Sequence, residues 1–332
     1  MSKLKPLPNL LRSRINLYSS LEILLDGVAS HYSLGSILDM DIITTGYEEL
    51  NIKTITSRGT YLVKIFSKFK SQSNIMDYVS GLLAFQDAGV PVPTLLSSST
   101  GYIYEYVEKK DVTYLCVMDY FVGSTFQTLQ VSISDIDHLV RYIAQIHNIS
   151  FALGKNYDSW GASHLLEEYA DKKKHLPKEF ADLIKPVIKE YRALDFSTFT
   201  RSIIHGDLQK NNVMRNGNSK YCILDLGCMD FGYSVIDLST FIAHFCSDLI
   251  SSKPAIDYNL YQQAINTYIK LRALNHNEIS AIPTLVRATY ASYLVAANFA
   301  LLKADDVSYA QTVAWIEFSK SGLLIPKQDL KI

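Results

Sequence analysis

The stretch His205-Gly206-Asp207-Leu208-Gln209-Lys210-Asn211-Asn212 decides how this chain is interpreted. It places an acid, Asp207, on a short polar loop and an amide, Asn212, five residues later. A second acid, Asp225, ends the apolar, β-prone run 221–224. Phosphoryl transfer uses such groups, because a carboxylate takes the proton of an attacking hydroxyl while carboxylate and amide oxygens hold Mg²⁺. The stretch therefore predicts a phosphoryl-transfer site.

The composition is that of a globular chain with room for two lobes. Of its 332 residues, 48% are hydrophobic and 20% charged, which excludes a disordered protein. The net charge of −1 provides no basic field for nucleic acid and no polybasic patch for a membrane surface. The four cysteines lack CxxC spacing, so we expect core residues and a reducing cytoplasm. The apolar window 284–302 contains Arg287 and Asn298 and predicts a buried helix rather than a membrane span.

The first third of the chain is predicted to be rich in β-strands. Strands are expected at 37–44, 50–56, 61–66, 102–107 and 113–121, and helices at 20–31 and 73–88. In the second helix, the apolar set includes Met76, Val79 and Leu82. These elements predict a small sheet accompanied by helices.

Beyond residues 119–123 helical patterns take over without a flexible linker. Ser132 and Asp135 have the spacing of a capping box. The basic run Lys172–Lys174 is expected to be a solvated face. Helices are expected at 132–147, 163–191, 233–247, 258–271, 279–303 and 306–321.

Two residues of the β-rich part invite a functional interpretation. Lys64 lies in the strand 61–66, on the same face as Leu62 and Phe66. Either an anionic partner neutralises its charge, or its stem carries the ammonium outward to water. Gly46 lies in the turn between the first two strands, where backbone N–H groups can approach phosphates, although an ordinary hairpin glycine fits the same pattern.

Together these motifs resemble the group of aminoglycoside phosphotransferases, choline kinases and type II homoserine kinases. The matching motifs are Gly46 and Asn51 of a nucleotide-covering hairpin, Lys64, the turn Gly89–Pro93, the hinge Met118–Gly123, His205 with Asp207 and Asn212, Asp225-Leu226-Gly227, and Asp237-Leu238. The resemblance extends over most of the chain. It implies an α+β, protein-kinase-like two-lobe fold. Residues 1–119 would form a nucleotide-binding lobe with an antiparallel sheet and a helix. Residues 120–332 would form a mainly helical lobe with the catalytic loop and the acceptor site.

The resemblance also implies roles for the residues of the opening stretch. Asp207 would accept or orient the proton of a small-molecule hydroxyl as it attacks the γ-phosphate of ATP. Asn212 and Asp225 would ligate Mg²⁺. His205 would be a structural brace of the loop rather than a general base.

A second set of roles concerns the nucleotide. Lys64 would hold the α- and β-phosphates, and the turn of Gly46 would cover them. Backbone groups of Asp119 and Phe121 would meet the adenine edge, with Met118 packed beside it.

The acceptor and part of its surroundings stay open at this point. Asp230, Tyr233 and the segment 157–169 are candidates for its wall, and an aminoglycoside, choline, homoserine or a sugar fits the pattern. Lys210 either adds a cation near the γ-phosphate or points to solvent. The alternative to an enzyme is a nucleotide-binding regulatory protein on the same fold. A protein kinase is disfavoured, because the sequence has no GxGxxG loop and no APE-type segment.

Overall fold

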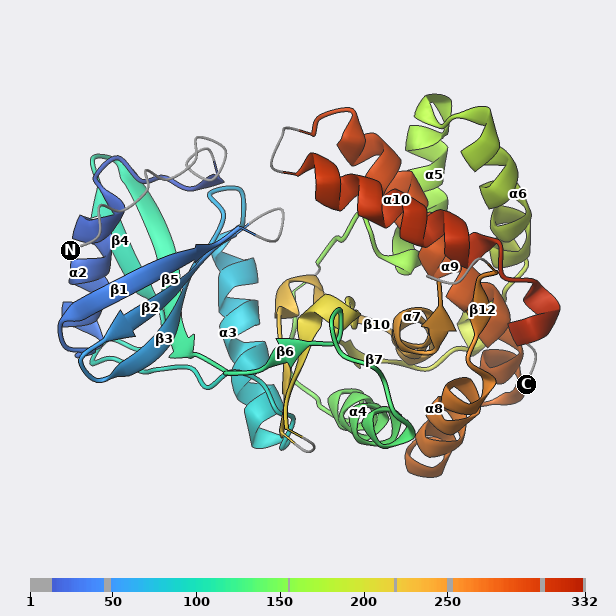
Figure 1. Cartoon of the computed structure of the whole chain (residues 1–332), viewed down its shortest axis with the longest axis horizontal. Helices are drawn as coiled ribbons and strands as arrows, with labels where there is room; N and C mark the ends of the chain where they lie inside the picture. The colour runs from blue at the N-terminus through green and yellow to red at the C-terminus, as the bar shows by residue number, and fades with distance from the viewer. Residues whose placement is uncertain are drawn as a thin grey trace. The chain divides into compact units, whose positions relative to one another are not determined.

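The computed structural model divides the chain into two compact units (Figure 1). One contains residues 1–86 and 92–122, and the other contains residues 87–91 and 123–332. The described residues are 14–44, 49–154, 156–217, 220–249, 253–304 and 308–330, so the predicted phosphate turn at Gly46 lies outside them. The predicted lobe boundary at residues 119 and 120 falls just before the change of unit after residue 122. The division of tasks between the two lobes stays a prediction.

The first unit is built on a five-stranded antiparallel sheet, as predicted. Its strand order is β1-β2-β3-β5-β4. The strands are β1 (Ile37–Ile43), β2 (Leu50–Thr56), β3 (Gly59–Ile65), β4 (Tyr104–Glu108) and β5 (Asp111–Asp119), and the helices are α2 (Leu21–His31) and α3 (Gln72–Asp87).

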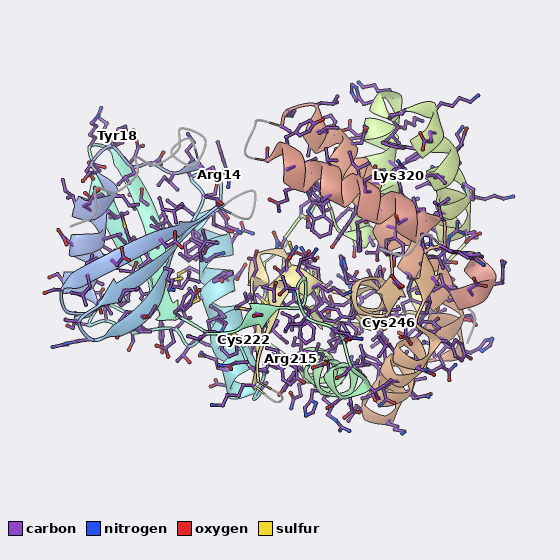
Figure 2. All side chains as sticks on the ribbon, viewed as in Figure 1. Arg14, Tyr18, Arg215, Cys222, Cys246 and Lys320 are labelled. Atoms are coloured by element: carbon purple, nitrogen blue, oxygen red, sulfur yellow. The ribbon has the colours of Figure 1, made fainter. Side chains whose placement is uncertain are left out.

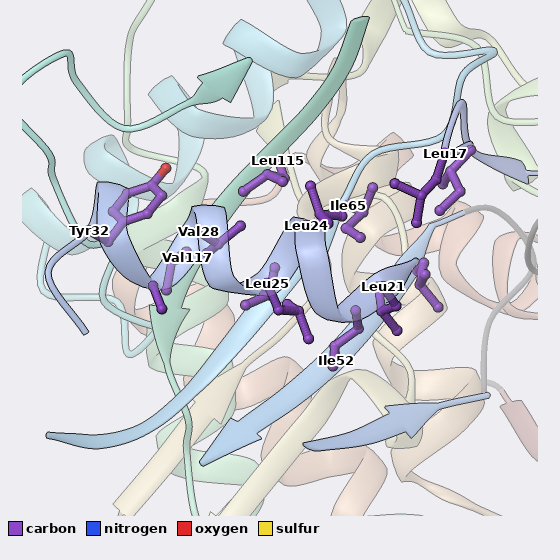
Figure 3. Packing of buried hydrophobic residues seen from close by; sticks show 14 of the residues in the cluster. Leu17, Leu21, Leu24, Leu25, Val28, Tyr32, Ile52, Ile65, Leu115 and Val117 are labelled. Atoms are coloured by element: carbon purple, nitrogen blue, oxygen red, sulfur yellow. The ribbon is translucent and has the colours of Figure 1, made fainter. Parts of the chain in front are cut away.

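Helix α2 covers one face of this sheet (Figure 3). It begins at the N-cap Ser20, whose side chain accepts a hydrogen bond from the Ile23 amide, and its apolar residues recur at helical spacing. Leu24, Leu25 and Val28 are almost fully buried in the cluster that contains Ile52 of β2, Ile65 of β3 and Val117 of β5. The role of α2 is therefore to shield the sheet from water.

Helix α3 contacts the side chains on the other face of β3. Successive strand residues point to opposite faces, so Lys64 points away from the face that holds Val63 and Ile65. Its ammonium lies 5.0 Å from the ring centre of Tyr78 in α3. The prediction that Met76 belongs to the buried side of this helix was wrong: Met76 is 50% exposed, and Ile75 and Tyr78 are buried instead.

The second unit is mainly helical, again as predicted. Its helices are α4 (Ile133–Ile146), α5 (Leu165–Lys172), α6 (Lys178–Arg192), α7 (Ser234–Phe245), α8 (Tyr258–Leu271), α9 (His276–Leu301) and α10 (Tyr309–Leu323). Its short strands are β6 (Ser124–Thr125), β7 (Arg201–Ile204), β8 (Val213–Asn216), β9 (Lys220–Ile223), β10 (Asp230–Tyr233), β11 (Ser247–Asp248) and β12 (Ala255–Ile256).

Helices α7 and α9 form the centre of this unit. Every residue of α7 is buried, and α9 packs against α5, α6, α7 and α10. The predicted buried helix at 284–302 corresponds to the larger part of α9. Among the described residues, no helix is both long and apolar enough to span a membrane.

The predicted capping box also anchors the strands that carry the site. Ser132 and Asp135 bond each other reciprocally at the start of α4. The Asp135 carboxylate accepts further hydrogen bonds from Arg215 Nη1 of β8 (2.6 Å) and from the Tyr221 hydroxyl of β9 (2.9 Å). Figure 2 labels Arg215 and, in the neighbouring strand, Cys222. The β8–β9 hairpin is therefore fixed to α4.

Candidate active site

The β8–β9 hairpin brings the two predicted metal ligands, Asn212 and Asp225, together. Asp207 follows β7 on this loop, and Asn212 ends a short 3-10 turn just before β8. Since β8 and β9 form an antiparallel hairpin, the chain after β9 returns to Asn212, where the Leu224 amide donates to the Asn212 carbonyl at 2.7 Å. Asp225 is the next residue. Hairpin geometry therefore places Asn212 and Asp225 beside each other.

The carboxylate of Asp207 is held by three side chains of the same unit. Its Oδ1 accepts from the Tyr293 hydroxyl (2.8 Å), and its Oδ2 accepts from Gln209 Nε2 (2.9 Å) and Asn212 Nδ2 (2.7 Å). Burial raises the pKa of this carboxyl, and the nearby Asp225 charge adds to the increase, although the bonds from Gln209 and Tyr293 lower it. Asp207 is thus oriented by fixed donors.

Asn212 and Asp225 suit a hard divalent cation. The Asn212 amide nitrogen donates to both the Asp207 carboxylate and the Asp207 carbonyl, which leaves its amide oxygen as the free end of the side chain. Asp225 is exposed and has a left-handed backbone, with φ 59°. No cluster of three or more His, Cys, Asp or Glu side chains in the described part of the chain could hold a metal. Mg²⁺ commonly takes one or two protein carboxylates plus substrate phosphates, so this donor set fits it.

Gly206 allows the catalytic loop to pack directly on the loop after Asp225. Its φ is +85°, and a Cβ at this position would lie 2.2 Å from the Cys228 carbonyl oxygen. A side chain is therefore excluded both by the backbone conformation and by this contact.

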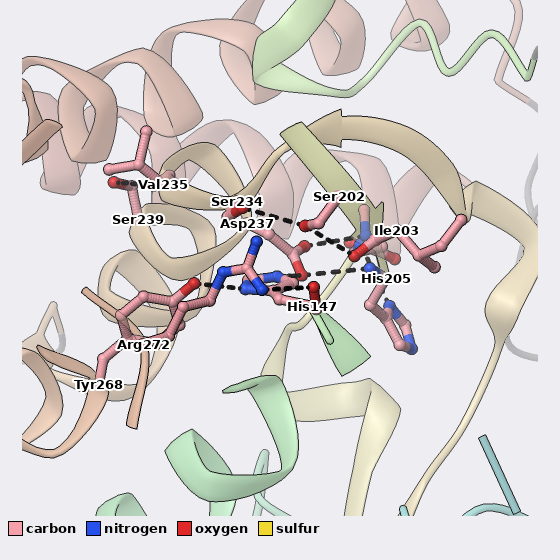
Figure 4. A network of polar contacts seen from close by, with 12 residues as sticks. His147, Ser202, Ile203, His205, Ser234, Val235, Asp237, Ser239, Tyr268 and Arg272 are labelled. Atoms are coloured by element: carbon pink, nitrogen blue, oxygen red, sulfur yellow. Dashed lines mark hydrogen bonds and ion pairs between the residues drawn. The ribbon is translucent and has the colours of Figure 1, made fainter. Parts of the chain in front are cut away.

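Asp237 of α7 holds the start of the catalytic loop through hydrogen bonds (Figure 4). Its carboxylate accepts from the backbone amides of His205 (3.1 Å) and Gly206 (2.9 Å) and from His147 Nε2 (3.0 Å). Burial favours the neutral acid, but the bond and charge of His147, the charge of His205 and the Gly206 amide together outweigh it, and the pKa of Asp237 is lowered. The Tyr268 hydroxyl lies 2.6 Å from His147 Nδ1, which makes the network continuous with α8.

His205 is fully buried and bonded at both ring nitrogens. Its Nε2 donates to the Leu224 carbonyl at 3.0 Å, and its Nδ1 accepts from the Asp207 amide at 3.3 Å. The imidazole therefore links the two loops of the site, which supports its predicted role as a brace.

An aromatic cluster adjoins Asp207 in the same unit. It consists of Trp160, His244, Tyr293, Trp315 and Phe318. The Tyr293 ring, whose hydroxyl bonds Asp207, lies 6.0 Å from Trp160 and 5.4 Å from Trp315. Asp158 acts electrostatically on Tyr293, and its carboxylate accepts from the Trp160 amide at 2.9 Å.

The segment before Trp160 is also bonded to the loop of Asp225. Asn156 Nδ2 donates to the carbonyl oxygens of Gly227 (2.8 Å) and Met229 (3.2 Å). Sequence reasoning missed this residue, because an asparagine in a polar loop gives no local signal of a distant partner.

Other residues predicted to line the acceptor site bind or pack against neighbouring side chains of the same unit. Glu168 is buried, ion-pairs with Lys172 and accepts from the Tyr157 hydroxyl at 2.5 Å. Lys172 is buried as well, so the prediction that 172–174 is entirely a solvated face was wrong. Tyr233 of β10 packs its ring against Phe196 and Phe199.

Lys210 of the catalytic loop is partly buried. Burial lowers the pKa of its ammonium, while the nearby Cys246 and Asp248 raise it. Burial likewise lowers the pKa of His244, to about 3, and the charge of Lys210 contributes to that decrease. The charge of Lys210 thus lowers the pKa of a histidine of the aromatic cluster.

In the first unit, Lys64 is neutralised by an anionic partner, which was one of the two interpretations of this buried lysine. It is 3% exposed, and its Nζ lies 3.2 Å from Glu49 Oε2. The other oxygen of Glu49 pairs with Lys70 at 2.7 Å. Glu49 comes just before β2, and its pairing with Lys64 across the β2–β3 register was not predicted.

The predicted hinge residues end β5 and continue into the connection to the second unit. Met118 is 1% exposed, Asp119 is exposed and Phe121 is partly buried. The Asp119 amide donates to the Thr94 carbonyl at 2.9 Å, so this amide is already used within the protein.

The fold and the site together define a protein-kinase-like phosphotransferase. The sequence profile of the phosphotransferase enzyme family APH matches residues 40–274, and the chain belongs to this family. It is a small-molecule phosphotransferase whose acceptor group is an alcohol.

Three similar proteins illustrate the match. The homoserine kinase of Methylobacillus flagellatus is 20% identical over 285 residues, which cover 84% of this chain and 83% of that protein. The structure of a microcompartment-associated aminopropanol kinase superposes with a TM-score of 0.69 at 14% identity and covers 91% of this chain and 99% of its own. An amicoumacin kinase solved with AMP-PNP, Ca²⁺ and amicoumacin also has a TM-score of 0.69, at 12% identity, covering 93% of this chain and 96% of its own.

Proposed function

We propose that this protein transfers the γ-phosphoryl group of ATP, with Mg²⁺, to the hydroxyl of a small amino alcohol of the homoserine type. The observation that carries the proposal is the Asp207 carboxylate, fixed by hydrogen bonds from Tyr293, Gln209 and Asn212. The similarity to a homoserine kinase over most of both chains supports the acceptor class.

The reaction needs one proton acceptor. The rest of catalysis is to position the acceptor hydroxyl and the γ-phosphate. The acceptor oxygen forms a bond to the γ-phosphorus while the bond from that phosphorus to the β,γ-bridging oxygen breaks, and ADP leaves. The hydroxyl proton passes to the Asp207 carboxylate. Asp207 serves this step because its oxygens are held by donors that do not need to reorganise.

The predicted nucleotide ligands keep the roles that the resemblance implies. Asn212 and Asp225 would ligate Mg²⁺, which neutralises phosphate charge when bound. Lys64 would hold the α- and β-phosphates, kept in place by Glu49. The turn of Gly46 would cover them. Backbone groups of Asp119 and Phe121 would meet the adenine edge, with Met118 packed beside it.

The acceptor would bind beside Asp207, at the aromatic cluster. Aromatic faces and a carboxylate attract an ammonium group, and Trp160, Trp315 and Asp158 supply both. The amino group of an amino alcohol would therefore lie toward Trp160 while its hydroxyl reaches Asp207. ADP release with L-homoserine, aminopropanols, choline and aminoglycosides tests this assignment, and no release with any of these amino alcohols would contradict it.

Nucleotide binding predicts a change in thermal stability. ATP with Mg²⁺ at about 100 times its Kd should stabilise the protein by about 2.7 kcal/mol, which raises Tm by several degrees. EDTA should remove most of this increase, since Asn212 and Asp225 would then lose the metal that joins them to the phosphates. Differential scanning fluorimetry measures both effects.

The control for this prediction is a matched pair of lysine variants. Lys64→Met should lose most of the ATP-induced increase in Tm, whereas Lys110→Met, at an exposed turn of the same unit, should keep it. Equal responses of the two variants would contradict the role of Lys64.

A further inference from the structure

Lys210 is a cation of the catalytic loop for which the described part of the chain supplies no hydrogen-bond or ion-pair partner. It lies between Asp207 and Asn212 in sequence and is partly buried. Within the described ranges it has no hydrogen bond and no ion pair. A partly buried ammonium without a partner is costly, because it loses hydration without gaining an opposing charge. Such a residue points to an anion that arrives with a ligand.

The surroundings of Lys210 identify the side of the loop that this anion would approach. Cys246 and Asp248 raise the pKa of Lys210, and the charge of Lys210 lowers the pKa of His244 at the end of α7. Asp248 is exposed to water, which screens its charge. His244 belongs to the aromatic cluster and contacts Tyr293 at 5.5 Å. Lys210 lies three residues after Asp207 on the same loop, and His244 contacts Tyr293, whose hydroxyl bonds Asp207, so both residues belong to the surroundings of Asp207.

His244 provides a second, independent observation. Its side chain is 3% exposed, and its Nε2 has no hydrogen-bond partner among the residues that the structure describes. Its ring is stacked on Phe318 at 4.6 Å, which fixes the ring plane. A buried polar atom without a partner is costly unless a ligand or water completes it. His244 thus offers an unused polar atom within an otherwise aromatic cluster.

We infer that Lys210, with His244 beside it, binds a carboxylate of the acceptor and so makes the enzyme select hydroxy amino acids over plain amino alcohols. The inference rests on the proposed function and specifies its acceptor. A hydroxy amino acid presents an ammonium and a carboxylate on the same carbon. Asp158 with Trp160 would take the ammonium, and Lys210 would take the carboxylate. The negative Asp158 and the positive Lys210 would then each face the opposite charge of the amino acid.

A pair of acceptors that differ only in the carboxylate tests this inference. L-Homoserine and 3-aminopropan-1-ol have the same hydroxyl, chain and amino group, but only homoserine has a carboxylate. In Lys210→Met, kcat/KM for homoserine should fall about 10- to 100-fold, the value of a hydrogen bond to a charged group. For 3-aminopropan-1-ol it should change less than about twofold. The KM for ATP should stay unchanged with either acceptor.

Two further variants separate this role from a structural one. Lys210→Arg keeps the positive charge and should recover a large part of the activity with homoserine. Lys174→Met makes the same substitution at an exposed lysine of the same unit and should leave both acceptors unaffected. The melting temperature of each variant, measured without ligands, shows whether the fold is intact.

Each alternative result overturns the inference in a recognisable way. Equal losses with both acceptors, together with a higher KM for ATP, would place Lys210 at the phosphates instead. Turnover of 3-aminopropan-1-ol but not homoserine by the unmodified protein would overturn the inference and leave the phosphotransferase proposal intact. Failure of every amino alcohol to release ADP would overturn both.

Discussion

Replacing Asp207 by Asn is expected to lower kcat by about 10²- to 10⁴-fold, the usual contribution of a positioned proton acceptor. The amide is nearly isosteric, and its oxygen can still accept from Gln209 and Asn212, while its NH₂ faces the Tyr293 hydroxyl. What the variant loses is the negative charge that accepts the hydroxyl proton. Steady-state ADP release with saturating ATP measures this loss.

Two comparisons make the Asp207 result specific. The ATP-induced increase in Tm should persist in Asp207→Asn, because nucleotide binding does not use the lost proton acceptor. Asp182→Asn, at an exposed carboxylate of the same unit that pairs with Lys185, should retain full activity. Activity within a few-fold of the unmodified enzyme in Asp207→Asn would refute the mechanism.

The second large effect is expected from Asp237→Ala. Asp237 is 1% exposed, and its loss leaves the His205 and Gly206 amides and His147 without their acceptor in the interior. Removal of one member of such a buried network typically costs about 3–5 kcal/mol. Urea unfolding at pH 7 measures this loss for the second unit. Activity should fall as well, because the same carboxylate fixes the loop of Asp207.

Matched variants and the pH dependence of stability test whether the buried Asp237 carboxylate causes this loss. Asp182→Ala removes an exposed carboxylate and should cost less than about 1 kcal/mol. Asp237→Asn, which keeps the size and one acceptor oxygen, should be less destabilised than Asp237→Ala. Since the pKa of Asp237 is lowered in the folded state, its contribution is present above its unfolded pKa of about 3.9 and is lost as pH falls through the folded-state value. A similar loss in Asp182→Ala and Asp237→Ala would contradict this account.

The sequence was sufficient for the parts of the site that depend on local spacing. Asp207, Asn212 and Asp225 lie on one loop and one hairpin, so their proximity follows from short-range chain geometry. The antiparallel sheet and the helical second unit follow from hydrophobic periodicity in the same way. His205 as a brace was predicted by resemblance, and its two ring bonds support it.

Residues whose partners are distant in sequence were not predictable in the same way. Tyr293 lies in a buried helix 86 residues from Asp207, and nothing in its neighbours distinguishes it from a core tyrosine. Glu49 reaches Lys64 through strand register, which a single sequence does not reveal. Lys172 looked like one of three solvated lysines, but its charge is neutralised by Glu168 one helical turn earlier.

The hydrogen bond from Tyr293 to Asp207 has a consequence for inhibitors. In the free protein this hydroxyl already satisfies the carboxylate oxygen that an acceptor hydroxyl would use. An arriving hydroxyl then exchanges with or shares an existing bond, so it adds little net affinity. Most of the binding energy must come from the remainder of the acceptor. A deoxy analogue, which retains the charged groups and lacks the hydroxyl, should therefore compete with the acceptor at comparable concentration and act as a dead-end inhibitor.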